Sequence, residues 1–144
     1  MKLCFAYGSN LGLEQMKKRC PGHEVVGKAT LDDYRWIINT RGYANVVPSK
    51  GDFVEGVLSR LTEDDEIQLD RNEGVAKGSY RKEYLYVRYK EQLTLVLVYV
   101  DPIVEKGTPM SAYIDRINKG LEDAKLSEAY VQRYIRPFVP APKS

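Results

Sequence analysis

Two short stretches, far apart in the chain, carry residue types that could act on a small charged molecule. The first is Phe5-Ala6-Tyr7-Gly8-Ser9-Asn10, which follows a short apolar segment and leads into a helix-like stretch over 11–19. A strand, a glycine-containing turn and a helix start in this order direct several backbone N–H groups to one place, where a carboxylate can bind. The alternative is that Ser9 or Asn10 only caps the helix.

The second stretch is Leu69-Asp70-Arg71-Asn72-Glu73-Gly74-Val75, with Ser79 and Tyr80 just beyond it. Glu73 falls at the expected end of a helix, where the carbonyl dipoles disfavour a carboxylate by up to about 1 kcal/mol. Burial between the flanking apolar stretches would raise its pKa toward neutrality, as general acid–base catalysis near pH 7 requires. The alternative is a solvated glutamate at a helix end.

The composition argues against a nucleic-acid partner and against a membrane span. The 144 residues include 22 basic and 20 acidic ones, interspersed along the chain, with a net charge of +2. Such a balance gives no field that would attract nucleic acid, so Lys17-Lys18-Arg19 is interpreted as a solvated helix end. No apolar run approaches the roughly 20 residues that a membrane helix needs.

The cysteines and the single histidine limit the chemistry further. Cys4 and Cys20 form no disulfide framework or metal motif and suit a reducing compartment, so we expect a cytoplasmic protein. One histidine, His23, excludes most zinc sites and any histidine-based triad that is not built on it. We therefore expect no metal site, and a Glu, Asp, Tyr or Lys side chain as the group that transfers protons.

The pattern of apolar and turn residues predicts strands over 3–7, 25–31, 34–39, 44–47 and 53–61, and a hairpin over 81–89 and 92–100. The chain is expected to break at Asp32-Asp33 and to turn over 49–52. Helices are predicted over 11–19, from the N-cap Thr62 to about 72 or 73, and from the N-cap Ser127 to a point before Pro137. A further helix is predicted over 110–122, with Thr108 as its cap and Pro109 at the first helical position.

These elements amount to about six or seven strands and four helices, and long alternation of strand and helix is absent. A doubly wound parallel sheet is therefore disfavoured. The expected fold class is α+β, a small mixed β-barrel with helices packed outside it and a ligand at its mouth. The chain is expected to form a single domain over 1–144, with a helical extension from about residue 125.

With both stretches in view, the sequence resembles the γ-glutamylcyclotransferase-like family (AIG2-like or γ-glutamylamine cyclotransferase-like). The family's opening motif is present intact at 5–10, and its Glu-Gly-Val followed by Gly-x-Tyr is matched by Glu73-Gly74-Val75 and Gly78-Ser79-Tyr80. Residues 51–57 look like the family's strand that crosses the barrel, and 109–113 match a turn that carries a substrate-contacting tyrosine, here Tyr113. The resemblance covers roughly residues 3–120.

The resemblance implies an enzyme without metal or cofactor that acts on a small γ-glutamyl compound. The free α-amine attacks the γ-carbonyl, and 5-oxoproline leaves with an amine or amino acid. Carried over by position, Glu73 is the general acid–base residue, and Tyr80 and Tyr113 would wall the pocket, although a core position for either tyrosine is the alternative. The cradle for the glutamyl group is formed by Ala6, Tyr7, Gly8, Ser9 and Asn10.

Two other functions stay open at this point. The enzyme could act on γ-glutamyl amines, such as glutamyl groups on a lysine side chain or on a natural-product intermediate, and Arg41, Asn45 and the C-terminal segment are candidates for the half of the pocket that would decide. Alternatively, the chain could be a non-catalytic binding domain of the same fold. The sequence also leaves the oligomeric state open, with a homodimer among the options.

Overall fold

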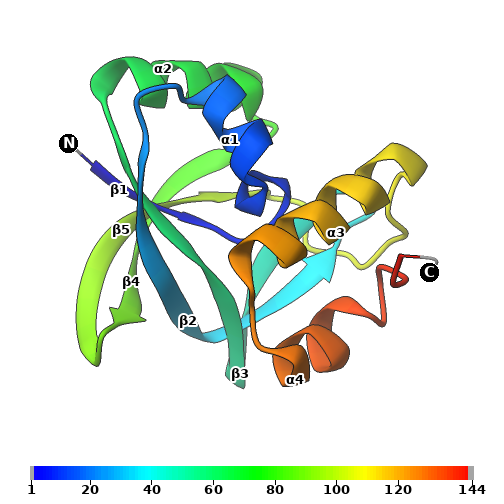
Figure 1. Ribbon diagram of the computed structural model, residues 1–144. Coiled ribbons are helices and arrows are strands. Elements are labelled where there is room, and N and C mark those ends of the chain that lie inside the picture. Colours follow the sequence, from blue (N-terminus) through cyan, green and yellow to red (C-terminus); the bar gives the residue numbers. More distant parts are fainter. Residues whose placement is uncertain (1, 143–144) are drawn as a thin grey trace.

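The computed structural model describes residues 2–142, and in this part of the chain five strands close into a barrel (Figure 1). The barrel order is β1-β3-β2-β4-β5, with β1 and β5 parallel and the other neighbours antiparallel. The fold is therefore the mixed β-barrel that the sequence predicts. The strands are β1 (Lys2–Ala6), β2 (Glu24–Ile38), β3 (Ala44–Leu61), β4 (Arg81–Tyr89) and β5 (Gln92–Val100).

The prediction of six or seven strands is wrong, because two pairs of expected short strands are each one long strand. The break expected at Asp32-Asp33 is a register irregularity between Asp32 and Tyr34, where Asp33 takes a positive φ of 63° and the pairing resumes. The turn expected at 49–52 lies opposite this irregularity, and the N–H of Gly51 donates to the Asp33 carboxylate at 3.0 Å. Both strands therefore bend together without ending. The hairpin of β4 and β5 has the predicted bounds.

The barrel closes along two short seams. The strands β2 and β3 pair over most of their length, as do β4 and β5. The β1–β5 seam, in contrast, is one residue pair, Cys4 with Leu97, and the β2–β4 seam is one pair, Thr30 with Arg88. Side-chain packing must therefore supply much of the stability of these two seams.

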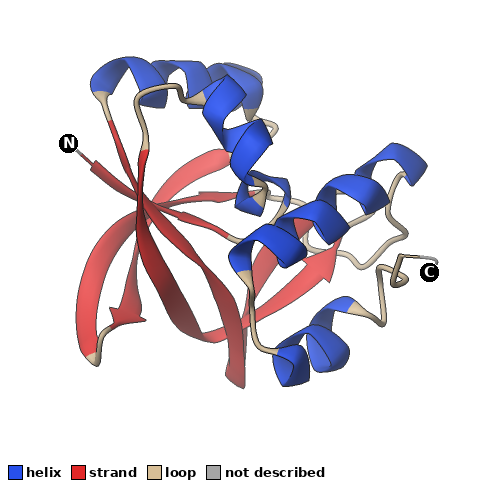
Figure 2. Ribbon diagram, in the orientation of Figure 1, coloured by secondary structure: helices blue, strands red, loops and turns tan. Residues whose placement is uncertain are grey.

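Helices cover one end and one side of the barrel (Figure 2). After β1 the chain forms a 3₁₀ turn, η1 (Ser9–Leu11), and then α1 (Leu13–Arg19); α2 (Glu63–Asn72) and a second 3₁₀ turn, η2 (Val75–Lys77), follow β3. The helices α1 and α2 lie over the β1–β5 seam, where their buried side chains form one apolar cluster with the strands. Its members are Cys4, Met16, Cys20, Leu61, Leu69, Leu97 and Tyr99.

The C-terminal helices pack on the main core. They are α3 (Ser111–Ala124) and the short α4 (Glu128–Tyr130), which continues as a π-helical turn, η3 (Val131–Ile135). Tyr134 donates its hydroxyl proton to Asp52 of β3 at 2.7 Å, and the hydroxyl of Ser127 donates to Glu55 at 2.7 Å. The segment after α3 is thus helical over 128–135, and these two hydrogen bonds attach it to β3. Within residues 2–142 no helix is long and apolar enough to span a membrane.

The helix caps divide into confirmed and wrong predictions. Thr62 caps α2 in a reciprocal capping box with Asp65, and Ser127 caps α4. Neither Ser9 nor Asn10 caps α1, which begins two residues later than predicted, with Gly12 as its N-cap. The N-cap of α3 is Met110, so Thr108 is not its cap, because the chain stays extended through Pro109 and Met110.

These caps predict different costs for two matched substitutions. Thr62→Ala removes the hydroxyl that accepts from the Asp65 N–H at 3.1 Å, and should lower the free energy of unfolding by about 1 kcal/mol. Thr108→Ala, at an exposed position outside α3, should change it by less than about 0.5 kcal/mol. Denaturant titration of both variants measures the difference. Equal losses would mean that the capping box does not stabilise α2.

Candidate active site

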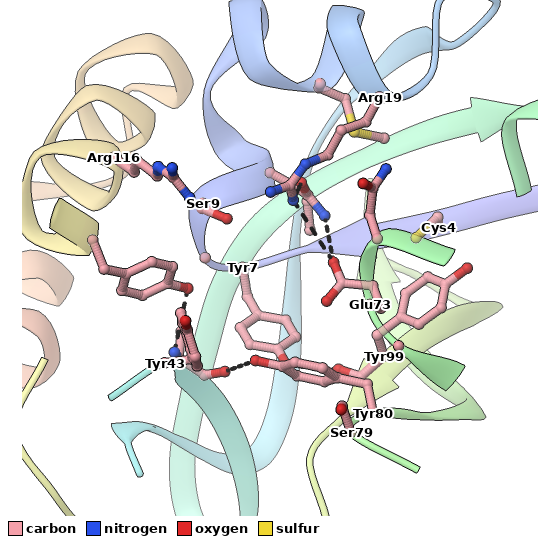
Figure 3. A pocket seen from close by; sticks show the side chains of 18 of the residues that line it. Cys4, Tyr7, Ser9, Arg19, Tyr43, Glu73, Ser79, Tyr80, Tyr99 and Arg116 are labelled. Carbon is pink, nitrogen blue, oxygen red and sulfur yellow. Dashed lines mark hydrogen bonds and ion pairs between the residues drawn. The ribbon is translucent and has the colours of Figure 1, made fainter. Parts of the chain in front are cut away.

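A pocket of about 440 Å³ lies between the turn after β1, the C-terminal end of α2 and the first turns of α3 (Figure 3). It brings together all eight residues that the resemblance assigns to catalysis and substrate binding, although Asn10 and Glu73 are 63 positions apart in the chain. Those residues are Ala6, Tyr7, Gly8, Ser9, Asn10, Glu73, Tyr80 and Tyr113.

Glu73 is positioned by the end of α2. One turn earlier, Leu69 is fully buried against the barrel, and Asp70 accepts hydrogen bonds from Tyr99 at 2.6 Å and from Lys82 at 3.1 Å. Glu73 is the C-cap residue, and Gly74 then reverses the chain with a φ of +65°. A side chain at Gly74 would be strained in that conformation and would place its Cβ 2.9 Å from the Ser79 hydroxyl. The helix end is thereby fixed relative to the strands.

The Glu73 side chain is only 15% exposed, so the alternative of a solvated helix-end glutamate does not hold. Its Oε1 accepts a hydrogen bond from the Asn10 amide nitrogen at 3.1 Å and lies 3.9 Å from the Arg19 guanidinium. Burial raises the pKa of Glu73, while Arg19, Asn10 and the more distant Arg41 act in the opposite direction, and burial outweighs them.

The turn after β1 presents its backbone to the pocket. The N–H groups of Gly8 and Asn10 find no acceptor among residues 2–142, and the N–H and hydroxyl of Ser9 face the Tyr113 oxygen. The space is tight at Gly8, where a Cβ would lie 3.0 Å from both the Ala44 Cβ and the Tyr113 oxygen. The N–H groups thus lie at the start of the 3₁₀ turn η1. The sequence pattern predicts them at the start of the following helix, which is α1.

The tyrosines of the pocket line it and also hold its backbone in place through hydrogen bonds. The Tyr80 hydroxyl donates to the Ala44 carbonyl at 2.9 Å, and the Ala44 N–H donates to the Tyr113 oxygen at 3.2 Å. Tyr7 donates to the Tyr99 carbonyl at 2.6 Å. Burial raises the pKa of Tyr113 to about 12, against the donors of Ala44 and Ser9, so this phenol stays protonated near neutral pH. The core alternative holds in part, because Tyr113 is only 7% exposed and also lines the pocket.

Sequence reasoning missed the cations of the pocket other than Arg41. The lining holds one carboxylate, Glu73, and five cationic side chains: Arg19, Arg41, Arg71, Lys77 and Arg116. The interpretation of 17–19 as a solvated helix end is wrong for Arg19, whose side chain is 23% exposed, although Lys17 and Lys18 are exposed. Helical spacing could have found it, since Arg19 shares a face with the buried Met16. Arg116 likewise lies one turn after Tyr113.

Of the candidates for the other half of the pocket, only Arg41 lines it. Its Nε donates to Asp101 at 2.8 Å, and its guanidinium lies over the rings of Tyr43 and Tyr80. Asn45 is fully buried and holds the backbone of Asp101, so it serves the framework. No described residue after Arg116 contributes to the lining, so the C-terminal segment up to 142 takes no part.

Comparison with known proteins agrees with the resemblance seen in the sequence. Residues 53–134, more than half of the chain, match the AIG2-like family. A mouse protein named γ-glutamylcyclotransferase is 28% identical over 142 residues, which cover 91% of this chain and 76% of the mouse protein. A bovine protein of the same name is 33% identical over 88 residues, 54% of this chain and 47% of its own length.

A solved structure named γ-glutamyl cyclotransferase has the same fold. It superposes with a TM-score of 0.85 at 25% identity, over 99% of this chain and 90% of that one. The family assignment and the barrel architecture predicted from the sequence are thereby confirmed.

The burial of Glu73 predicts a pH-dependent stability difference. The unfolded chain binds this proton with an ordinary glutamate pKa of about 4.3, and the fold raises the pKa. The folded protein therefore binds more protons between the two pKa values, so the free energy of unfolding falls as pH rises through that window. Glu73→Gln removes this loss, so its stability relative to wild type should increase as the pH rises above the ordinary glutamate pKa and through the raised pKa of folded Glu73.

Denaturant unfolding at a series of pH values measures this difference. Glu122→Gln, which makes the same charge change at an exposed position of α3, is the control. A Glu73→Gln curve that stays parallel to wild type at all pH values would contradict the burial of an ionised carboxylate.

Proposed function

The chain belongs to the AIG2-like family, and we propose that it is a γ-glutamylcyclotransferase that releases 5-oxoproline and an amino acid from a γ-glutamyl amino acid. The observation that carries the proposal is the hydrogen bond from Asn10 to Glu73. It joins the turn suited to bind the glutamyl group to the one carboxylate of the described lining. An acid and a cradle in contact are what this cyclisation needs.

Proton transfer is assigned to Glu73. The α-ammonium of the substrate must lose a proton before its nitrogen can attack the γ-carbonyl carbon, and ionised Glu73 accepts that proton. As the ring forms and the amide C–N bond breaks, the departing nitrogen takes protons back through the same carboxyl group. The α-ammonium loses two protons in all, the lactam nitrogen keeps one, and the amine leaves as an ammonium. Glu73 therefore ends each turnover ionised, as it began.

The cradle is assigned two further tasks. The N–H groups at Gly8 and Asn10, with the Ser9 hydroxyl and the Tyr113 phenol, can hold the substrate carboxylate and the oxygen of the developing tetrahedral intermediate. Nucleophile and electrophile share one molecule, so holding the folded conformer contributes much of the acceleration, up to about 7–11 kcal/mol in favourable intramolecular reactions.

The buried thiols take no part in this chemistry. Cys4 and Cys20 are free and buried, and burial raises the pKa of both, that of Cys20 to about 12. Neither forms a useful thiolate near neutral pH. Two unpaired thiols also fit a reducing compartment, and we propose a cytoplasmic location on that ground.

The charges of the pocket favour a leaving group that carries a carboxylate. Five cations against one carboxylate attract a γ-glutamyl amino acid, whose two carboxylates outweigh its α-ammonium, and disfavour a leaving amine that bears an additional positive charge. Arg41 is already paired with Asp101, whereas Arg116 has no ion-pair partner among the described residues and borders the pocket beside Ser9 (Figure 3). The amino-acid substrates are therefore preferred over the γ-glutamylamine alternative.

Substitution of the acid distinguishes an enzyme from a binding domain. Glu73→Gln should lower kcat for 5-oxoproline release by about 10²- to 10⁴-fold, the usual contribution of general acid–base catalysis. The side chain keeps its size and its hydrogen bond with Asn10 can be re-formed, so binding of 5-oxoproline should persist. Chromatographic detection of 5-oxoproline measures the rate, with Glu122→Gln as the control. Wild-type rates in the Glu73→Gln variant would remove Glu73 from the mechanism.

A matched pair of substrates tests the preference for a carboxylate. γ-Glutamyl-alanine and γ-glutamyl-ethylamide differ only in the carboxylate of the leaving group. A charge-assisted hydrogen bond contributes about 1.5–3 kcal/mol, so kcat/KM should be about 10- to 100-fold higher for the alanine compound. Glutathione and γ-glutamyl-ε-lysine extend the panel. Equal rates for the matched pair would favour the γ-glutamylamine reading, and ligand binding without 5-oxoproline from any compound would favour a binding domain.

A further inference from the structure

Three polar side chains form a line that ends on the proposed acid. Arg19 donates from Nη1 to the Asn10 Oδ1 at 2.7 Å, and Asn10 donates from Nδ2 to the Glu73 Oε1 at 3.1 Å. Figure 3 shows Arg19 and Glu73 facing each other across this contact. The side chains of Arg19 and Glu73 are 23% and 15% exposed, so water competes little for these bonds.

The chemistry of the three groups fixes the direction of the line. A guanidinium only donates hydrogen bonds, an ionised carboxylate only accepts them, and an amide does both. An Asn10 amide turned by half a rotation would set its NH₂ against the guanidinium and its oxygen against the carboxylate. Both contacts would be repulsive, so Arg19 selects the one orientation in which Asn10 donates to Glu73.

We propose that Arg19 is a positioning residue for the reaction, which acts through Asn10 to hold Glu73 Oε1 in place and to leave Oε2 for the ammonium of the substrate. The identity of that proton donor rests on the function proposed above. Oε2 accepts no hydrogen bond from any residue of 2–142, while Oε1 is engaged. The two oxygens thus have separate tasks, one structural and one chemical.

Arg19 also bears on the titration of Glu73. The charged groups that face the carboxylate are Arg19 from α1 and Arg41 from the segment between β2 and β3. Burial raises the pKa of Glu73, and Arg19 opposes it most strongly, so loss of Arg19 should raise the pKa further. The titratable groups around the carboxylate are Cys4, Tyr7, Cys20, Tyr80 and Tyr113, all with pKa values raised by burial.

Arg19→Met keeps most of the apolar stem and removes the donor. We expect kcat to fall about 10- to 100-fold, as for a misplaced catalytic group, with a smaller change in KM. The rising limb of the pH–rate profile should shift to higher pH. Lys17→Met makes the same charge change on the exposed face of α1 and should leave both unchanged.

A double-mutant cycle with Asn10→Ala separates positioning from charge alone. If Arg19 acts through the Asn10 amide, Arg19→Met should lower kcat much less in the Asn10→Ala background than in wild type. Arg19→Lys should return the pH profile toward wild type without restoring kcat, because an ammonium keeps the charge but not the planar geometry. Equal losses in both backgrounds, or full rescue by Arg19→Lys, would overturn the proposal.

A measurement that needs no turnover tests the role of Arg19 independently of the proposed reaction. The ¹³C-carboxyl resonance of Glu73, in protein labelled at glutamate, should titrate at higher pH in Arg19→Met than in wild type. An unchanged titration would overturn the inference even if 5-oxoproline is released. If wild type releases none from any substrate, the reaction fails while the titration still tests the contact. Arg19→Gln serves as a second variant should Arg19→Met fold poorly.

Discussion

The site depends on one buried carboxylate held between two parts of the chain. Glu73 ends α2, and the side chain that meets it, Asn10, lies in the turn after β1. Removing a carboxylate from water is costly unless hydrogen bonds and nearby charges compensate. Asn10 and Arg19 supply that compensation in part, and the raised pKa of Glu73 shows that it is incomplete. The pKa of this acid is therefore raised by burial and held back by its two polar neighbours.

The surrounding cations and aromatic rings complete the environment of this acid. Arg41 is anchored by Asp101 and stacked against Tyr43 and Tyr80, so its position is set by the framework. Asn45 and Asp101 hold each other through backbone and side-chain hydrogen bonds at the base of the same region. Asn45 and Asp101 thus satisfy each other, whereas the N–H groups of Gly8 and Asn10, which line the pocket, find no acceptor among residues 2–142.

Local signals in the sequence were sufficient for some elements and not for others. The capping box at Thr62 and the glycine at 74 defined α2, and therefore the place of Glu73, because caps act within one turn. The join of β2 across Asp33 could not be predicted, since an apparent turn there is maintained as strand by pairing with distant residues of β3. Arg19 was missed for a related reason. The Arg19 side chain points inward because it shares the face of α1 that packs on the barrel with Met16. In the sequence, three consecutive basic residues gave no indication of which one lies on that face.

The β1–β5 seam gives the two helices above it a second role. One residue pair joins these strands, and the apolar cluster beneath α1 and α2 bridges the gap. Arg19 belongs to one of these helices and Glu73 to the end of the other. The apolar cluster that holds β1 against β5 therefore also holds the two helices that carry Arg19 and Glu73. Looser packing in this cluster would separate Glu73 from Asn10 while the long ladders of β2–β3 and β4–β5 stayed paired. Activity would then be lost before the barrel unfolds.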